Sequence, residues 1–208
     1  MLKLYFCLLP TGEIIFPEAL LSDYRREKLA RQKNPVLRKR SLCSERLLRY
    51  ALRDQGFTLP GPLAIAAGDY GKPYLIDDSC RFSLSDSGSA LLCALSDREI
   101  GADIQRLTPV NAALMRRFYT EAEQAYVLSS ADRDAAYTEI WTKKESYCKA
   151  SGKGLLLSLT SFSVTDKPIA DRLLFGKRGE YLISVYMAEG ELPETLPLEQ
   201  IESSALLE

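Results

Sequence analysis

Apolar and polar residues repeat with strand-like and helix-like periods in mixed order along this chain. The apolar segment 1–9 predicts a first strand, because it is too short to span a membrane and has no small-residue cleavage site. Residues 90–95 and 99–105 predict two strands joined as a β-hairpin by the polar turn 96–98. Three more strands are predicted at residues 161–164, 172–175 and 181–187, the last two joined by a glycine-containing turn at 176–179.

The helical pattern predicts three helices between these strands. Ser41 is a predicted N-cap for a helix that runs to about residue 55 and stops at Gly56. Thr120 and Glu123 have the spacing of a capping box, so a second helix should begin there. The third covers residues 134–151 and ends at Gly152. Mixed strands and helices favour the α+β class.

Composition narrows the chemistry available to this chain of 208 residues. It contains no histidine, which excludes Ser-His-Asp hydrolysis, histidine-based zinc catalysis and histidine-ligated haem. Its five cysteines include no CxxC pair and predict reduced, buried thiols rather than disulfides or a zinc ribbon. These features, and the lack of a predicted membrane span, lead us to expect a cytoplasmic protein.

Charge is distributed unevenly despite a net charge of −1. Residues 22–53 hold eleven Lys or Arg against three acids, whereas residues 189–208 hold six acids and no base. The basic segment is either an anion-binding site or a solvated helix face. Nucleic acid is disfavoured as the anion, because the pI is about 5.8 and aromatic residues are not interspersed among these bases.

Two short patterns bring oxygen donors together. Asp103 and Gln105 leave the same face of a predicted strand, and Glu145 and Lys149 share one stripe of a predicted helix with Trp141. If strand and helix face each other, Asp103, Gln105 and Glu145 converge as ligands suited to Mg²⁺, and Lys144 and Lys149 would neutralise phosphate oxygens. The alternative is an ordinary surface Glu–Lys pair worth roughly 0.2–0.5 kcal/mol. None of the Gly-Lys pairs closes a P-loop pattern.

The sequence resembles the Sfp-type (surfactin-type) 4'-phosphopantetheinyl transferases over nearly its whole length. Residues 141–155, WTKKESYCKASGKGL, are similar to the family signature W-x-x-K-E-S/A-x-x-K-x-x-G-x-G-L at every fixed position. Residues 101–105, GADIQ, are similar to its G-x-D-x-E strand. Residues 82–88 resemble its F-N-x-S-H-S-G segment, residues 71–73 its G-K-P, and residues 26–41 its basic coenzyme-binding helix and the Arg-Ser/Thr pair after it.

The resemblance implies a Mg²⁺-dependent enzyme that transfers the phosphopantetheine arm of coenzyme A to a serine of an apo acyl or peptidyl carrier protein, releasing 3',5'-adenosine bisphosphate. It also implies a pseudo-dimer of two similar α+β lobes, here residues 1–104 and 105–208, with coenzyme A in the cleft between them. The first lobe would contact the nucleotide, and the second would carry the metal and the catalytic helix. Members of this kind act as monomers.

The resemblance also implies roles for individual residues. Asp103 and Glu145 would bind the metal together with Gln105, and Glu145 would also act as the base on the carrier serine, directly or through a water. Lys149 would neutralise phosphate charge during catalysis. Trp141 is expected to pack in the core. The residues expected to bind the coenzyme are Arg25, Lys28, Arg40, Ser41, Lys72, Ser85, Asp86, Lys144 and Lys149.

Two positions depart from the family pattern. Gln105 replaces a glutamate, which keeps an oxygen donor but removes a charge beside the metal. Asp86 replaces a histidine that helps to hold the 3'-phosphate, and its carboxylate would repel that group. Either a nearby cation compensates, or the 3'-phosphate lies elsewhere, or the chain is a non-catalytic coenzyme A- or carrier-binding protein on the same fold, which is the second hypothesis. A nucleic-acid-binding protein is a third, disfavoured by the charge balance.

Overall fold

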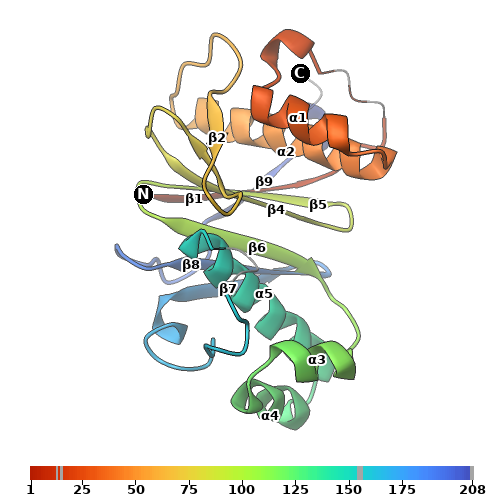
Figure 1. Cartoon of the computed structure of the whole chain (residues 1–208), viewed down its shortest axis with the longest axis vertical. Coiled ribbons are helices and arrows are strands. Elements are labelled where there is room, and N and C mark those ends of the chain that lie inside the picture. Colours follow the sequence, from red (N-terminus) through yellow and green to blue (C-terminus); the bar gives the residue numbers. More distant parts are fainter. Residues whose placement is uncertain (13, 15, 154–156, 207–208) are drawn as a thin grey trace.

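The chain forms an α+β structure in which a four-stranded and a three-stranded sheet lie between two groups of helices (Figure 1), and a third sheet has only two strands. The computed structural model describes residues 1–206 except 13, 15 and 154–156. Gly154 and Leu155 of the motif at 141–155 therefore lie outside the described residues. In Figure 1, helices α1 and α2 lie above the first sheet, and the second sheet and helices α3, α4 and α5 lie below it. The structure confirms the α+β class predicted from the sequence.

The helices and strands follow in mixed order, as the sequence pattern predicts. The α-helices are α1 (Asp23–Arg31), α2 (Pro35–Asp54), α3 (Ala112–Phe118), α4 (Glu121–Ser129) and α5 (Arg133–Ser151). Short 3-10 turns are η1 (Glu18–Leu20), η3 (Ala170–Arg172) and η4 (Ser203–Leu206). The strands are β1 (Leu2–Leu8), β2 (Ile65–Ala67), β3 (Pro73–Leu75), β4 (Arg81–Ser87), β5 (Ala90–Ser96), β6 (Ile100–Arg106), β7 (Leu173–Arg178), β8 (Tyr181–Met187) and β9 (Leu198–Ile201).

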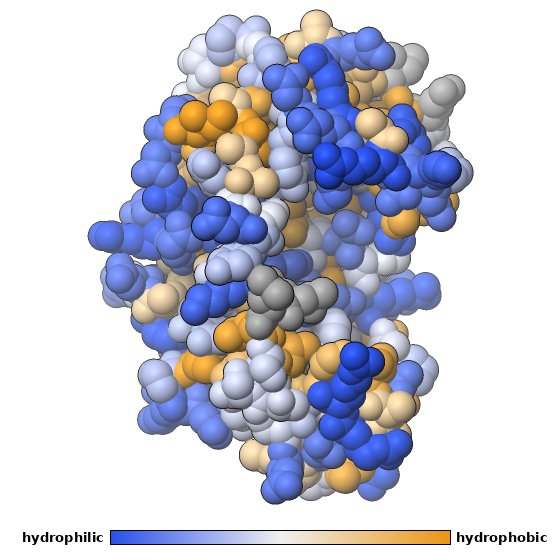
Figure 2. Space-filling model, in the orientation of Figure 1, coloured by the Kyte–Doolittle hydropathy of each residue, from blue (hydrophilic) through white to orange (hydrophobic). Residues whose placement is uncertain are grey.

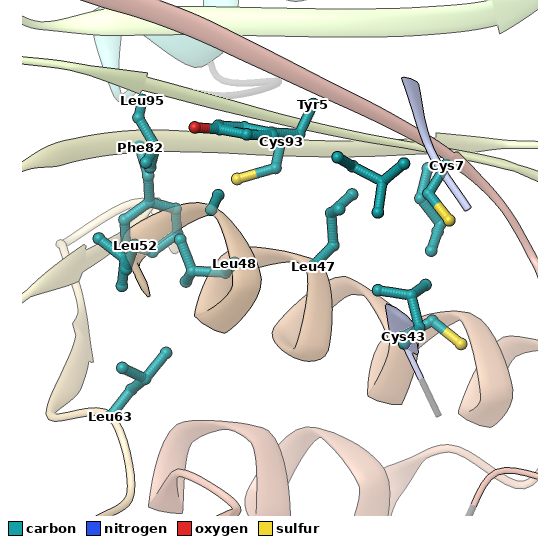
Figure 3. Packing of buried hydrophobic residues seen from close by; sticks show 14 of the residues in the cluster. Tyr5, Cys7, Cys43, Leu47, Leu48, Leu52, Leu63, Phe82, Cys93 and Leu95 are labelled. Carbon is teal, nitrogen blue, oxygen red and sulfur yellow. The ribbon is translucent and has the colours of Figure 1, made fainter. Parts of the chain in front are cut away.

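The first sheet has the strand order β4-β5-β1-β9 and carries α2 on one face. Leu47, Leu48 and Leu52 of α2 point toward the sheet, where they pack with Tyr5 and Cys93 (Figure 3). β9 returns from the end of the described chain and pairs in parallel with β1. Residues 104 and 105, on either side of the expected boundary, both lie in β6 (Ile100–Arg106).

The predicted hairpin at residues 90–105 is wrong, although both of its strands exist. β5 pairs with β1 and β4, whereas β6 pairs with β8 in the second sheet, which has the order β6-β8-β7. The physical reason is that β5 is buried on both faces. Leu91, Cys93 and Leu95 face the core under α2, and the alternate residues Ala90, Leu92 and Ala94 face the second sheet. The chain therefore leaves the plane of the first sheet after β5.

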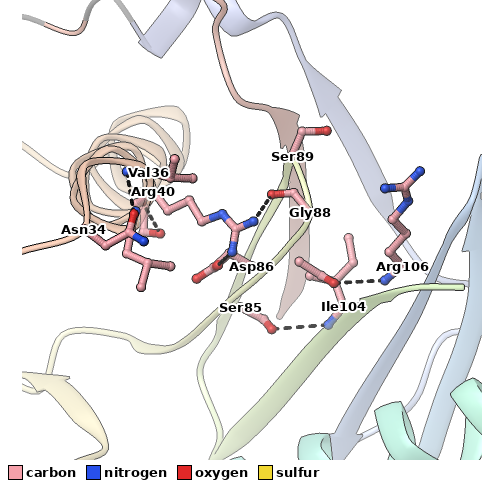
Figure 4. Close-up of polar contacts among 12 residues, drawn as sticks. Asn34, Val36, Arg40, Ser85, Asp86, Gly88, Ser89, Ile104 and Arg106 are labelled. Atoms are coloured by element: carbon pink, nitrogen blue, oxygen red, sulfur yellow. Dashed lines mark hydrogen bonds and ion pairs between the residues drawn. The ribbon is translucent and has the colours of Figure 1, made fainter. Parts of the chain in front are cut away.

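A row of serines joins the two sheets where β4 lies beside β6. Main-chain N–H groups of Ala102, Ile104 and Arg106 donate to the hydroxyls of Ser83, Ser85 and Ser87, at 2.9, 3.3 and 3.0 Å respectively. In a continuous sheet, the carbonyl groups of a neighbouring strand would accept these bonds. Here the serine hydroxyls accept them, so the N–H groups along the unpaired edge of β6 have hydrogen-bond partners. Figure 4 shows the bond from Ile104 to Ser85.

The helix predictions are confirmed except at one end. The N-cap of α2 is Asn34, seven residues before Ser41, because Asn34 accepts bonds from the N–H groups of Val36 and Leu37 and Pro35 occupies the first turn. Thr120 and Glu123 form the expected capping box. α5 ends as predicted at Gly152, which has a φ of +68° that glycine adopts without strain.

Three further sequence predictions meet different outcomes. The strand expected at residues 161–164 is irregular, because the Val164 N–H and the Phe162 carbonyl bond to buried side chains instead. β7 continues to Arg178, through most of the predicted turn. All five cysteines are free and buried, as predicted. Within the described ranges, no helix is long and apolar enough to cross a membrane.

Candidate active site

A pocket of about 280 Å³ opens between α1 and the end of α5. In Figure 1, α1 lies above α5, and Figure 2 shows strongly hydrophilic side chains over α1. α1, α2, the loop before β3, β4 and α5 contribute its lining residues: Tyr24, Arg25, Lys28, Ser44, Tyr70, Gly71, Lys72, Pro73, Phe82, Ser83, Leu84, Ser85, Asp86, Cys148, Lys149 and Gly152.

A carboxylate cluster on β6 and α5 adjoins this pocket through Ser85 and Lys149, which line it and contact Asp103. Asp103 is only 2% exposed, and its Oδ1 accepts bonds from Ser85 Oγ at 2.6 Å and Lys149 Nζ at 2.7 Å. Its Oδ2 accepts a bond from the Gln105 amide at 3.1 Å. Asp103 and Gln105 therefore leave the same face of β6, as the two-residue period predicts, and Lys149 and Ser85 join them.

Glu145 lies one turn before Lys149 on α5 and completes the cluster. Burial raises the pKa of Glu145, the negative charge of Asp103 raises it further, and Lys149 opposes both effects. The negative charge of Asp103 beside Glu145 favours a nearby cation, and the Lys149 ammonium supplies one at 2.7 Å from Asp103. The sequence-based expectation that β6 and α5 face each other is confirmed.

Gly101 allows this close approach of β6 to α5. A Cβ atom at this position would lie 2.0 Å from the carbonyl oxygen of Ser146 and 2.3 Å from the main-chain nitrogen of Ala150. Any side chain would push the helix away from the strand. Glycine at position 101 therefore sets the separation between Asp103 and the two α5 side chains.

The donor set at this cluster fits Mg²⁺, the metal that the family resemblance implies. Asp103 and Glu145 supply hard carboxylate oxygens, and Mg²⁺ is usually held by one or two carboxylates with waters and substrate phosphates completing its shell. The Gln105 amide oxygen accepts a bond from the Ser87 hydroxyl at 3.3 Å in this structure. Within the described part of the chain, no group of three His, Cys, Asp or Glu side chains could hold a metal.

Two cations from α1 line the opposite side of the pocket. Arg25 is buried and held by Glu45 at 3.2 Å and by the Ser41 hydroxyl at 2.8 Å. Ser41 therefore contacts Arg25 but does not itself line the pocket. Desolvation in the pocket, followed by the charges of Arg25 and Lys149, lowers the pKa of Lys28, and Asp86 partly offsets this. These like charges favour binding of an anion in the pocket.

Asp86 has a cationic partner in this structure. Arg40 on α2 forms an ion pair with Asp86 at 3.2 Å and donates a second bond to the carbonyl of Gly88 (Figure 4). A nearby cation therefore compensates the carboxylate, which was one of the alternatives left open by the sequence. Arg40 Nε is buried with no hydrogen-bond partner within the described residues.

Two residues predicted to bind the coenzyme already have partners within the protein. The Lys72 ammonium bonds to Glu99 at 2.8 Å and to the carbonyls of Ile100 and Ala150, although its side chain lines the pocket. The expectation that Lys144 faces the phosphates is corrected by the structure. Lys144 is completely buried on another side of α5, where it pairs with Glu123 at 2.8 Å. The neighbouring positions 144 and 145 point in different directions because successive helical residues are rotated by about 100°.

Sequence reasoning missed the residues that hold the expected site in place. Glu45, Glu99 and Glu123 are the counter-ions of Arg25, Lys72 and Lys144. The sequence held one signal for the counter-ion role of Glu45, because Glu45 is one of only three acids within the basic segment 22–53. Trp141 packs against Phe118, as predicted, with ring centroids 5.9 Å apart.

Comparison with known proteins points to one family. A family model described as the 4'-phosphopantetheinyl transferase superfamily matches residues 99–196. The chain is 29% identical over 177 residues to the 4'-phosphopantetheinyl transferase gsp of Aneurinibacillus migulanus, covering 84% of this chain and 73% of that protein. It is 31% identical to Sfp of Bacillus subtilis strain 168, covering 70% and 66%, and 32% identical to another Bacillus subtilis 4'-phosphopantetheinyl transferase, covering 75% and 71%.

Proposed function

Because this chain belongs to the 4'-phosphopantetheinyl transferase superfamily and is an enzyme of that class, we propose that it modifies a serine of an apo acyl or peptidyl carrier protein. Coenzyme A is the proposed donor, bound in the pocket between α1 and α5. The proposal includes a cytoplasmic monomer built as two similar lobes, with the coenzyme in the cleft between them. The free cysteines support the reducing location.

In the proposed reaction, the carrier serine oxygen attacks the pyrophosphate phosphorus that bears the pantetheine arm. A new P–O bond forms to the serine, the bridging P–O bond breaks, and 3',5'-adenosine bisphosphate leaves. Glu145 accepts the serine proton, directly or through a water, and its raised pKa brings it closer to neutral pH, where a base is most effective. Lys149 balances the charge that develops on the phosphate oxygens.

Asp103 and Glu145, with Gln105 beside them, would hold Mg²⁺, which would neutralise the pyrophosphate when bound. Ser85 and Lys149 orient Asp103 through the bonds to its Oδ1. Arg25 and Lys28 would attract the phosphates from the opposite side of the pocket. We assign the nucleotide contacts to Arg40, Lys72, Ser85 and Asp86, with Ser41 acting through Arg25.

The observation that carries this proposal is that Asp103 bonds to Ser85 and Lys149, two lining residues of a pocket whose other side is cationic. A polyanionic substrate with a reacting pyrophosphate needs both features at once. The experiment is a chromatographic assay for 3',5'-adenosine bisphosphate in mixtures of the chain, coenzyme A and an apo carrier protein. Release should require the carrier and stop when EDTA removes divalent metal. Release without carrier, or none with it, would contradict the proposed reaction.

Lys149→Ala should lower kcat more than it raises KM for coenzyme A, because the phosphate charge that Lys149 balances is greatest in the transition state. Steady-state kinetics with saturating carrier measures both parameters. Lys143→Ala is the matched control, since Lys143 lies on the same helix but pairs with Glu139. A change confined to KM would assign Lys149 to binding alone.

Asp86→His should lower KM for coenzyme A about tenfold while changing KM for dephospho-coenzyme A little. The substitution removes a carboxylate and frees Arg40 for the 3'-phosphate, and a hydrogen bond to a charged group is worth roughly 1.5–3 kcal/mol. Asp86→Ala removes the carboxylate without adding a donor, and so separates loss of charge from gain of a donor. An unchanged ratio of the two KM values would mean that Asp86 does not face the 3'-phosphate.

A further inference from the structure

Most of the positive charges that line the pocket between α1 and α5 are balanced within the protein. Three of its four lining cations have carboxylate partners, in the pairs Arg25–Glu45 at 3.2 Å, Lys72–Glu99 at 2.8 Å and Lys149–Asp103 at 2.7 Å. The fourth, Lys28, forms no ion pair with any carboxylate in the described part of the chain. The pocket therefore has one lining cation whose charge is left for a new anion.

Asp86 is the only acidic side chain among the described lining residues. Its Oδ2 pairs with Arg40 at 3.2 Å (Figure 4), and its Oδ1 has no hydrogen-bond partner across the described ranges. Desolvation and the charge of Arg25 lower the pKa of Lys28, and the charge of Asp86 opposes both, so Asp86 acts on the unpaired cation. The lining thus contains a carboxylate oxygen that can accept a hydrogen bond from a ligand.

β4 places this carboxylate beside an apolar surface. Phe82, Leu84 and Asp86 alternate with the serines that contact β6, so they share the other face of the strand. Phe82 belongs to the core under α2, Leu84 packs against that core, and both line the pocket. An apolar surface that ends at a hydrogen-bond acceptor suits a nucleoside, whose base is flat and whose ribose carries hydroxyl groups.

Coenzyme A, the proposed donor, brings more negative charge than this lining balances. Its diphosphate is the reacting group, and its ribose also carries a phosphate monoester with about 1.5 to 2 negative charges at neutral pH. Lys28 and the site of Asp103, Glu145 and Lys149 serve the diphosphate in the proposed reaction. No unpaired lining cation of the described chain is then left for the ribose phosphate.

We propose that this pocket reads the donor's ribose through free hydroxyl groups, so that 3'-dephospho-coenzyme A binds more tightly than coenzyme A, which remains the weaker donor. In dinucleotide-binding folds, an acidic residue bonds to a ribose hydroxyl, whereas an arginine accommodates a ribose phosphate. Here Asp86 supplies the acceptor, and Arg40 is engaged by Asp86 and by the carbonyl of Gly88. This inference rests on the proposed function, because it names the donor for the same site.

The test is a calorimetric titration of the full chain with each of the two compounds, at constant ionic strength and with Mg²⁺ but no carrier. The Kd for 3'-dephospho-coenzyme A should be about tenfold lower, because the ribose phosphate of coenzyme A meets the Asp86 carboxylate and no unpaired cation. Equal or tighter binding of coenzyme A would overturn the proposal, and so would failure of the chain to bind either compound.

Asp86→Ala links the preference to this carboxylate. It should reduce the ratio of the two Kd values from about tenfold to about one, because the repulsion is removed and Arg40 is released. Asp69→Ala is the matched control, since Asp69 is an exposed acid in the loop before β3 and does not line the pocket. It should keep the wild-type ratio. A preference that persists in Asp86→Ala would overturn the proposal.

Transfer to an apo carrier, measured with each donor, separates this inference from the proposed function. Transfer from both donors with tighter binding of coenzyme A would overturn the donor preference and leave the proposed function standing. Tighter binding of 3'-dephospho-coenzyme A with no transfer from either compound would support the donor preference and contradict the proposed function.

Discussion

Replacing Glu145 by glutamine should lower the single-turnover rate of transfer about 10²- to 10⁴-fold while the chain stays folded. The variant keeps the shape of the side chain but removes both a proposed metal ligand and the proposed base, and general-base catalysis alone contributes a factor of that size. Glu145 carries a raised pKa from burial and from Asp103, so loss of its charge also relieves repulsion and should not destabilise the fold.

The measurement is rapid-quench kinetics with excess enzyme, with the unfolding midpoint of each variant determined in parallel. Glu139→Gln is the control, because Glu139 lies on the same helix and pairs with Lys143 and Tyr126 outside the carboxylate cluster. It should react at nearly the wild-type rate. A Glu145→Gln rate within a few-fold of wild type would remove Glu145 from both proposed roles.

Lys144→Met should destabilise the chain by about 3–5 kcal/mol, which is the usual cost of breaking a buried ion pair by removing one partner. Lys144 and Glu123 are both fully buried. The ammonium also donates to the carbonyls of Leu159 and Phe162, and Glu123 accepts bonds from the main chain of Thr120 and Val164. The pair therefore joins α5, the start of α4 and the segment after α5.

Urea unfolding of the two single variants and the double variant measures this coupling. Lys144→Met with Glu123→Gln should recover part of the loss, because no unpaired charge remains buried. Lys143→Met should cost about 1 kcal/mol or less, since its ion pair is more exposed. If Lys144→Met were no more destabilising than Lys143→Met, the buried pair would have no structural role.

Local periodicity predicted much of this fold and some of the expected site. The strand at residues 181–187 matches β8, and Gly152 ends α5 as predicted. The same-face arrangement of Asp103 and Gln105 followed from the two-residue period of β6. These features depend on neighbours in sequence, so a single segment contains the information.

Pairing between distant segments could not be read from the sequence in the same way. β5 and β6 have the spacing of a hairpin but enter different sheets, and the serine row on β4 that joins those sheets resembles an ordinary polar strand face. On α5, buried polar residues such as Thr142, Lys144 and Ser146 hide the boundary between faces. The direction of Lys144 therefore depends on Glu123, a partner that no local pattern identifies.

The most direct test of the account is the intact mass of an apo carrier protein after incubation with this chain, coenzyme A and Mg²⁺. The carrier should gain the mass of one phosphopantetheine group, and peptide mapping should locate that group on a single serine. Coenzyme A binding to the chain, with no change in mass for any carrier of the fatty acid, polyketide or nonribosomal peptide type, would contradict it. That result would indicate a coenzyme-binding protein without transferase activity.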